Sequence, residues 1–377
     1  MNEWNKFSLR DNPFDIFSYE HDMADRKEEW GRVESLLKSA FSGKGPRIVL
    51  LLGDYGIGKT FILEKIYHQS LSKDKRVLVV RGDVLYEKRL AIMESEPRWS
   101  KFGLDFITRI FDNIEREKLI STMSKIDFKK FRSKFSKIFQ GIGNNDDNAF
   151  KYITGEKVPA KTLQKFELSY PLSDSPTGIE LFFEFLRAIK FAGYDNFLML
   201  VDEFEYITSV LGEKKITQIL NTFRQIYDDF GIYDRRYNNN LAKPIFMFAI
   251  SPGGWESLRE LDKTARKKTG GGGIAPFMER ISGKDIISLK AFSLEDSLEL
   301  VQLRLSEARF EKTKNPLLPF TKKCIEFVHK VSFNKPRNVL QYCKILLEDA
   351  LEEGIKEIDA ADAKRILSKY GISLQEK

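Results

Sequence analysis

A glycine-rich loop between an apolar run and a helix is the feature that most constrains this chain. Residues 48–52 are all apolar, and the sequence GDYGIGKT follows directly. The spacing of Gly53, Gly58, Lys59 and Thr60 is the complete P-loop pattern. A strand that leads through such a loop into a helix is typical of a parallel α/β unit. We therefore expect a parallel sheet with helices on both faces.

The residue types of this loop suit a nucleoside triphosphate. Glycines let successive backbone N–H groups point at phosphate oxygens, and the N-terminus of the following helix adds a favourable field. Lys59 would reach the β- and γ-phosphates of ATP, and the Thr60 hydroxyl would be a Mg²⁺ ligand. The alternative is a glycine-rich turn that happens to carry a lysine. The residues expected to contact the nucleotide are Gly53, Asp54, Tyr55, Gly56, Ile57, Gly58, Lys59, Thr60 and Phe61.

A pair of acids follows a second apolar run. Residues 197–201 read as a buried parallel strand, and Asp202 and Glu203 stand at its C-terminal end, where open α/β sheets bind ligands. Asp202 would hold Mg²⁺ through water, and Glu203 would polarise the attacking water. The alternative is a strand that ends in a solvated acidic turn. Glu205 lies two residues further on, and we expect it to be structural.

Three other positions are candidates for catalytic roles. Ser251 ends the expected strand 245–250, so its hydroxyl would touch the γ-phosphate or the water, or else cap the following turn. Arg280 precedes the expected strand 286–289, and Arg337 opens a helix. Taken alone, each arginine is more often a partner in a surface ion pair.

The rest of the chain divides into a nucleotide-binding domain, 1–290, and a helical lid domain, 291–377. Residues 88–175 read as a mostly helical insertion, with helices at 99–120 and 126–138 and a loop at 141–148. A polar loop is expected at 234–240. Other helices are expected at 25–41, 59–69, 178–192, 215–230, 293–310, 321–331, 336–353 and 360–370, and another strand at 76–81. Asp359 is the expected N-cap of the last helix.

Composition excludes several classes of protein. Lys and Arg number 62 against 55 Asp and Glu, and the formal charge of +7 permits a nucleic-acid partner without requiring one. Two cysteines, Cys324 and Cys343, are too few for a disulfide framework, and no metal-ligand spacing occurs. No apolar run approaches the roughly 18 residues that a membrane span needs. The N-terminus lacks a signal pattern, so we expect a cytoplasmic protein with no membrane partner.

Taken in order, these motifs resemble those of AAA+ ATPases. The resemblance covers nearly the whole chain and implies a P-loop NTPase fold of AAA+ type with a C-terminal helical lid. It further implies that Ser251 is the sensor-1 residue and Arg337 the sensor-2 residue. Arg280 matches the arginine finger, which in this family acts in trans on a neighbouring subunit's nucleotide. A ring or filament is the working form that the resemblance implies.

Short sequence segments point to a particular group within this family. GDYGIGKTFIL, residues 154–156 and residues 192–195 before LVDEFE are similar to the ATP-binding proteins of BREX phage-defence systems. Origin-recognition ATPases and TnsC-like transposition regulators are similar more distantly. The lid motif reads Asn334-Lys335-Pro336-Arg337 where the family usually has Gly-Asn-Pro-Arg. We expect no winged-helix domain after Tyr370.

Two hypotheses describe what the ATP cycle drives. In the first, an oligomer acts on DNA through basic residues of the insertion or through the loop 265–273, which contains Arg266, Lys267 and Lys268. In the second, ATP state controls binding to an effector protein. A solvated helix face over an aromatic packing stripe would explain the basic insertion equally well. Its basic residues are Lys118, Lys125, Lys129, Lys130, Arg132, Lys134 and Lys137.

Overall fold

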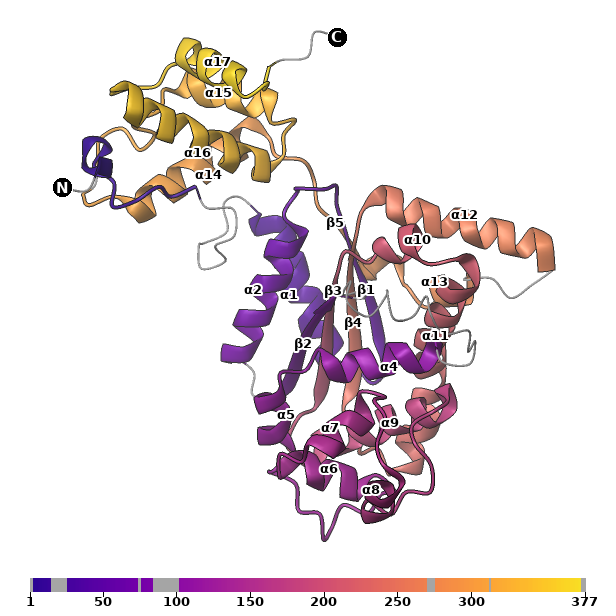
Figure 1. The fold of residues 1–377 in the computed structure, drawn as a ribbon. Helices are drawn as coiled ribbons and strands as arrows, with labels where there is room; N and C mark the ends of the chain where they lie inside the picture. The colour runs from indigo at the N-terminus through magenta and orange to yellow at the C-terminus, as the bar shows by residue number, and fades with distance from the viewer. Residues whose placement is uncertain are drawn as a thin grey trace. The chain divides into compact units, whose positions relative to one another are not determined.

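The chain folds into two compact units (Figure 1). A computed structural model describes residues 3–14, 26–73, 76–83, 102–269, 275–311 and 313–373. The helical unit contains residues 1–33, 53–62 and 288–377. The sheet unit contains residues 34–52 and 63–287. The helical unit thus combines both terminal segments with the ten-residue stretch that holds the glycine-rich loop.

A five-stranded sheet is the centre of the fold, and its strand order is β2-β3-β4-β1-β5. The strands are β1 (Arg47–Leu52), β2 (Val77–Asp83), β3 (Asn196–Asp202), β4 (Lys243–Ile250) and β5 (Ile286–Ser288). The pairs β1–β4, β3–β4 and β2–β3 are parallel. Every residue of β3 is buried, as expected for a parallel strand covered on both faces. The expected α/β fold class is confirmed.

The strand register shows which residues lie at the carboxyl edge and which at the amino edge of the sheet. Leu52 pairs with Ile250, and Asp202 pairs with Asp83, so the carboxyl ends of four strands share one edge. Asn196 pairs with Lys243 at the start of β3 and β4, which belongs to the opposite, amino edge.

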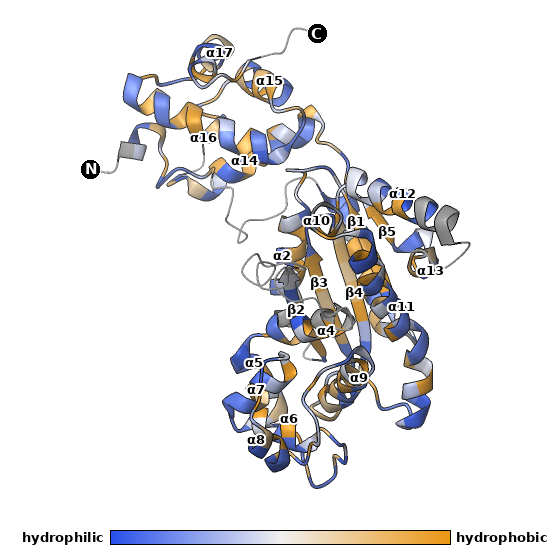
Figure 2. Cartoon of the chain, turned by 45° about the vertical axis from the view of Figure 1, so that its right-hand side comes forward, coloured by the Kyte–Doolittle hydropathy of each residue, from blue (hydrophilic) through white to orange (hydrophobic). Residues whose placement is uncertain are grey.

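Helices lie on both sides of this sheet (Figure 1). Figure 2 shows hydrophobic residues along β3 and β4 and hydrophilic residues on the outer faces of the surrounding helices. Phe223 of α11 packs edge-on against Phe246 and Phe248 of β4, with ring centres 5.1 and 4.9 Å away. The helices are α1 (Lys27–Ser42), α2 (Lys59–Lys73), α9 (Ser175–Phe191), α10 (Tyr206–Val210), α11 (Glu213–Arg236), α12 (Pro252–Thr269) and α13 (Ala275–Met278).

The insertion is helical, but its boundaries differ from the expected ones. It contains α4 (Phe102–Asp112), α5 (Arg116–Met123), α6 (Ser136–Gly143), α7 (Asp147–Ile153) and α8 (Ala160–Lys165). The expected helix 99–120 is interrupted at 113–115, and its first three residues lie outside the described residues.

The expected helix 126–138 is wrong for most of its length, because 125–135 form turns and irregular segments. Serine side chains satisfy the backbone there, since Phe135 N donates to Ser133 Oγ and Ser133 N to Ser136 Oγ. Phe131 and Phe135 are nevertheless buried. Their spacing therefore indicated buried positions correctly but did not indicate a helix.

Two expected loops are shorter than predicted. Of 141–148, only 144–146 lies outside helices, because α6 runs to Gly143 and Asp146 caps α7. Of 234–240, the first three residues belong to α11. Likewise, residues 265–269 of the expected basic loop form the end of α12, and 270–273 lie outside the described residues.

The helical unit confirms the expected tail helices. They are α14 (Leu294–Ala308), α15 (Lys322–Val331), α16 (Pro336–Glu353) and α17 (Ala360–Lys369). Asp359 caps α17, and its side chain accepts hydrogen bonds from the N–H groups of Ala361 and Asp362. Phe14 from the N-terminal segment packs edge-on against Phe320, with ring centres 5.8 Å apart.

Cys324 and Cys343 are buried free thiols in the core of the helical unit. Within the described residues, no helix combines the length and apolar character needed to cross a membrane.

Candidate nucleotide-binding site

The loop after β1 has a backbone that accommodates side chains poorly. Gly56 and Gly58 have φ values of +77° and +103°, which L-residues with side chains rarely adopt. A Cβ on Gly53 would lie 2.6 Å from Ile57 Cγ2. The loop therefore requires glycine at these positions to form the tight turn, as a phosphate-binding loop does.

Lys59 is folded back over this loop. Its Nζ donates to the carbonyl oxygens of Gly53 at 2.7 Å and Asp54 at 3.2 Å, and only 8% of the residue is exposed. An ammonium carries three donors, so two are used by the loop and one remains for a ligand. The loop thus presents a buried positive charge beside its own backbone, a combination suited to a polyphosphate.

The first turn of α16 contacts the same loop. Arg337 N donates to Gly56 O at 3.3 Å, and its Nη1 donates to the phenol oxygen of Tyr55 at 2.9 Å. The guanidinium lies 5.3 Å from the centre of the Tyr55 ring. The structure therefore brings Arg337 to the predicted phosphate loop, although the sequence before Arg337 differs from the family's usual motif.

Arg26 is a residue that sequence reasoning missed. Its Nη2 donates to Ile57 O at 2.8 Å and to Lys290 O at 3.0 Å, and its guanidinium lies 4.9 Å from the centre of the Phe292 ring. Burial lowers the pKa of Arg26, and Glu29 opposes that effect. Arg26 ties the glycine-rich loop to the segment that leads into α14. A lone arginine ahead of a helix carries no spacing signal that could have identified it.

The acid pair lies at the carboxyl edge of the sheet. Asp202 is 5% exposed, and its Oδ1 accepts a hydrogen bond from Glu203 N at 2.9 Å. Glu203 is exposed and has a φ of +47°, which is rare outside glycine. Such backbone strain is concentrated at functional sites, because it must be stabilised by the surrounding structure. Here Phe204, fully buried, donates from its N to Ala249 O at 2.9 Å and anchors the turn.

The structural role expected for Glu205 stays a prediction. Among the described residues its buried Oε2 has no hydrogen-bond partner. A Cβ on Gly254 would lie 2.2 Å from Glu205 Cβ, so the start of α12 packs directly on this residue. An orphaned carboxylate oxygen is costly and points to a group that the polypeptide itself does not supply.

Ser251 takes the capping alternative in this structure. Its Oγ accepts a hydrogen bond from Gly254 N at 3.1 Å, and its carbonyl accepts one from Trp255 N at 2.9 Å. It therefore begins α12 at the end of β4, at the same edge as Asp202. Its assignment as the sensor-1 residue stays a prediction.

Arg280 lies at the other edge of the sheet. It forms a two-pronged ion pair with Asp228 of α11, through Nε at 3.0 Å and Nη2 at 2.9 Å, and its Nη1 donates to Pro276 O at 2.7 Å. It lines a hollow together with Arg47, the first residue of β1. The structure thus places it away from the edge where Asp202 stands.

Most basic residues of the insertion have partners inside the protein. Lys134 pairs with Glu180, Lys137 with Glu167 at 3.8 Å, and Lys130 with Asp127 at 3.6 Å. Lys118 donates to Val79 O at 2.6 Å, and burial lowers its pKa. Since 125–135 form turns and irregular segments, these residues do not make the single basic helix face that the DNA hypothesis uses.

The loop and the acid pair suit the chemistry of Mg²⁺ and a triphosphate. The positive φ values of Gly56 and Gly58 form the tight turn of the loop, and Lys59 supplies charge beside it. Thr60 and Asp202 offer the hydroxyl and carboxylate oxygens that Mg²⁺ prefers.

Comparison with known proteins identifies the fold of the chain but not its family. No family model matches the chain. An uncharacterized HTH-type transcriptional regulator of Methanocaldococcus jannaschii is 22% identical over 375 residues, which cover 98% of this chain and 75% of that protein. The ORC2 protein of Aeropyrum pernix, solved in ADPNP-ADP complexes, matches with a TM-score of 0.51 at 11% identity, over 95% of this chain and 71% of that one. Its ADP form matches with a TM-score of 0.52 at 12% identity, over 96% and 73%. The chain therefore shares the fold of the ORC2 protein.

Proposed function

We propose that this protein binds Mg²⁺-ATP and hydrolyses it. The observation that carries the proposal is the glycine-rich loop with Lys59 folded over its carbonyls and Arg337 docked on Gly56 and Tyr55. The side chain of Tyr55 in this loop is 66% exposed and is therefore not needed for core packing. The ORC2 structure that shares the fold contains ADPNP and ADP, which supports a nucleotide ligand.

The acid pair would act on the same nucleotide. The loop directly follows β1, and β1 is separated from β3 by one strand, which corresponds to about 10 Å. Thr60 and Asp202 would hold Mg²⁺, which would neutralise charge on the phosphate oxygens.

Glu203 is the proposed residue that activates water. Its carboxylate would accept a proton from water as the water oxygen bonds to the γ-phosphorus and the bond to the β–γ bridging oxygen breaks. ADP and phosphate are the products. Ser251 and Arg337 would contact the γ-phosphate from the end of β4 and from the helical unit.

Arg280 is proposed to serve a neighbouring subunit. Its place at the amino edge, beside Asp228, supports a role in trans, because its own acid pair belongs to the carboxyl edge. A ring or filament would follow from this arrangement.

Lys59→Ala tests the proposal directly. We expect ATP affinity to fall by about 10- to 100-fold, because a charged hydrogen bond contributes on the order of 1.5–3 kcal/mol. Lys161→Ala, an exposed lysine of α8, is the matched control and should bind as the parent does. Calorimetric titration with ATP and Mg²⁺ is the measurement, and unchanged affinity in Lys59→Ala would refute the site.

The target of the ATP cycle is proposed to be DNA. The relative from Methanocaldococcus jannaschii is named an HTH-type transcriptional regulator, which supports this target. DNA binding that depends on ATP and weakens steeply with salt would be the expected signature. Defence, transposition and replication are the candidate pathways. The similarity of GDYGIGKTFIL to ATP-binding proteins of BREX systems favours defence.

A nucleotide-gated switch that controls an effector protein is a second candidate. The docking of Arg337 on Tyr55 and Gly56 favours it, because it links the nucleotide loop to α16 within one compact unit. The helical unit also exposes Phe310, Phe333 and Tyr370, each more than half accessible, which suit a protein contact. Binding of a protein partner that changes between ATP and ADP, without DNA affinity, would favour this function.

A further inference from the structure

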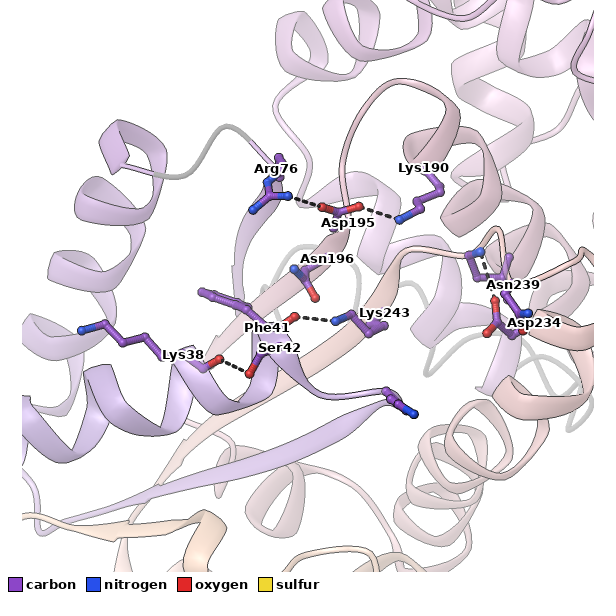
Figure 3. Close-up of a pocket in the computed structure, with 12 residues that line it drawn as sticks. Lys38, Phe41, Ser42, Arg76, Lys190, Asp195, Asn196, Asp234, Asn239 and Lys243 are labelled. Carbon is purple, nitrogen blue, oxygen red and sulfur yellow. Dashed lines mark hydrogen bonds and ion pairs between the residues drawn. The ribbon is translucent and has the colours of Figure 1, made fainter.

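A cavity at the amino edge of the sheet is a second candidate binding site (Figure 3). Its volume is about 480 Å³, and all of its lining residues belong to the sheet unit. Asn196 and Lys243, paired at the start of β3 and β4, line it together with the end of α1. Because β3 has seven residues, this edge lies ~20 Å from the carboxyl edge. The cavity is therefore separate from the acid pair.

The lining of this cavity is strongly basic. Five cationic residues and two acidic residues line it, which leaves an excess of three positive charges. The carboxylates are Asp195 and Asp234. The cations are Lys38, Lys44, Arg76, Lys190 and Lys243.

Internal pairing neutralises only part of this charge. Asp195 accepts from Lys190 at 2.5 Å and pairs with Arg76 at 3.2 Å, and the Lys190 hydrogen bond lowers the pKa of Asp195. Lys243 donates to the carbonyl oxygens of Phe41 and Gly43 at the end of α1.

Lys38 and Lys44 are exposed, and no ion pair to either occurs in the described part of the chain. Both therefore remain available to an anion at the rim of the cavity.

Asn196 provides an independent sign of a ligand. It is 4% exposed and lines the cavity, yet its Oδ1 has no hydrogen-bond partner among the described residues. A buried amide oxygen without a donor destabilises the fold, and native proteins rarely keep one without reason. A ligand with a hydroxyl or amino group would satisfy it. An anion without a hydroxyl group, such as sulfate, would not.

We propose that this cavity binds a small phosphorylated molecule that also carries hydroxyl donors, such as a sugar phosphate. The cations meet the phosphate, and the Asn196 oxygen accepts from a hydroxyl group. The cavity falls within the size range of small-molecule sites, about 300–1,000 Å³. A nucleic acid, in contrast, is recognised along an extended basic stripe, whereas these cations line one hollow.

The experiment uses the full chain with Lys59→Ala, so that the glycine-rich loop does not compete for the probes. Inorganic phosphate and ribose 5-phosphate are titrated in a calorimeter without Mg²⁺. Both should bind, ribose 5-phosphate more tightly. Adding Lys38→Gln and Lys44→Gln should weaken both about tenfold or more, since charge-assisted hydrogen bonds are lost. The matched pair Lys157→Gln and Lys161→Gln, exposed elsewhere with equal charge change, should alter affinity less than twofold.

Asn196→Ala separates the two parts of the site. It should remove the preference for ribose 5-phosphate and leave phosphate binding intact. Should this buried variant fail to fold, the exposed lysine pair still decides the matter. The proposal is overturned if neither probe binds, if both lysine pairs weaken binding equally, or if only a DNA duplex responds to Lys38→Gln and Lys44→Gln.

Discussion

Arg337 donates a hydrogen bond from Nη1 to the phenol oxygen of Tyr55 across 2.9 Å, and its guanidinium lies over the face of that ring. Tyr55 belongs to the glycine-rich loop, and Arg337 belongs to the first turn of α16. The side chain assigned to read the γ-phosphate is thus held by the loop that would bind the phosphates. A bound triphosphate would have to share or displace this contact.

Arg337→Ala should therefore slow ATP turnover by about tenfold or more, because a charged contact to the transition state is lost. Tyr55→Phe keeps the ring but removes the hydrogen-bond acceptor, and it should cause a smaller loss in the same direction. Steady-state kinetics would measure both. If Tyr55→Phe is silent while Arg337→Ala is severe, the tyrosine does not position the arginine.

Glu203→Gln should bind ATP as the parent does and hydrolyse it about 100- to 10,000-fold more slowly, the usual contribution of a general base. Glu117→Gln, an exposed glutamate of α5, is the matched control and should hydrolyse ATP as the parent does. Phosphate release in single turnover, alongside nucleotide binding, is the measurement. Hydrolysis at the parent rate would show that another group activates water.

Backbone strain at Glu203 gives a separate prediction about stability. Glycine adopts a φ of +47° without strain, so Glu203→Gly should abolish hydrolysis and raise the free energy of unfolding by about 1 kcal/mol. Urea denaturation of the two proteins compares them. A loss of stability would mean that side-chain contacts of Glu203 outweigh its backbone strain.

Subunit mixing tests the role of Arg280 in trans. Arg280→Ala and Glu203→Gln should each be inactive alone. In a mixed oligomer, an intact Glu203 from one protein would meet an intact Arg280 from the other, and ATPase activity should reappear. Asp228→Asn, which removes the intramolecular partner of Arg280, is expected to retain activity. No recovery at any mixing ratio would assign Arg280 to its own subunit's structure.

His329 in the helical unit should make stability depend on pH. Burial lowers its pKa below the ordinary value of 6.5, with Glu295 and Asp296 opposing, and its Nδ1 lies 2.9 Å from Ser297 Oγ. The unfolded chain then binds the proton more readily, so stability is lost as pH falls through 6.5 toward the lowered native value. Thermal unfolding between about pH 7 and pH 5 should fall less steeply for His329→Asn than for the parent. Equal slopes would exclude the effect.

The central strands and the tail helices could be predicted because sequence pattern and burial coincide there. Residues 197–201 form one apolar run on a strand buried on both faces, and Asp359 has the side chain that a helix N-terminus needs. The roles assigned to Glu203, Ser251 and Arg280 remain predictions.

The insertion could not be predicted in the same way. Phe131 and Phe135 have helical spacing but pack from turns, which Ser133 and Ser136 stabilise through their hydroxyls. Such local side-chain bonds compete with a helix and leave the apolar pattern unchanged. Arg26 was missed for another reason, because its partners Ile57 and Lys290 are carbonyl groups distant in sequence.

The pairing of Phe14 with Phe320 joins the two ends of the polypeptide in one core. Shortening the chain at residue 290 would therefore remove Phe320 from Phe14 and Arg337 from Tyr55. A C-terminal truncation would therefore disturb both the N-terminal segment and the glycine-rich loop.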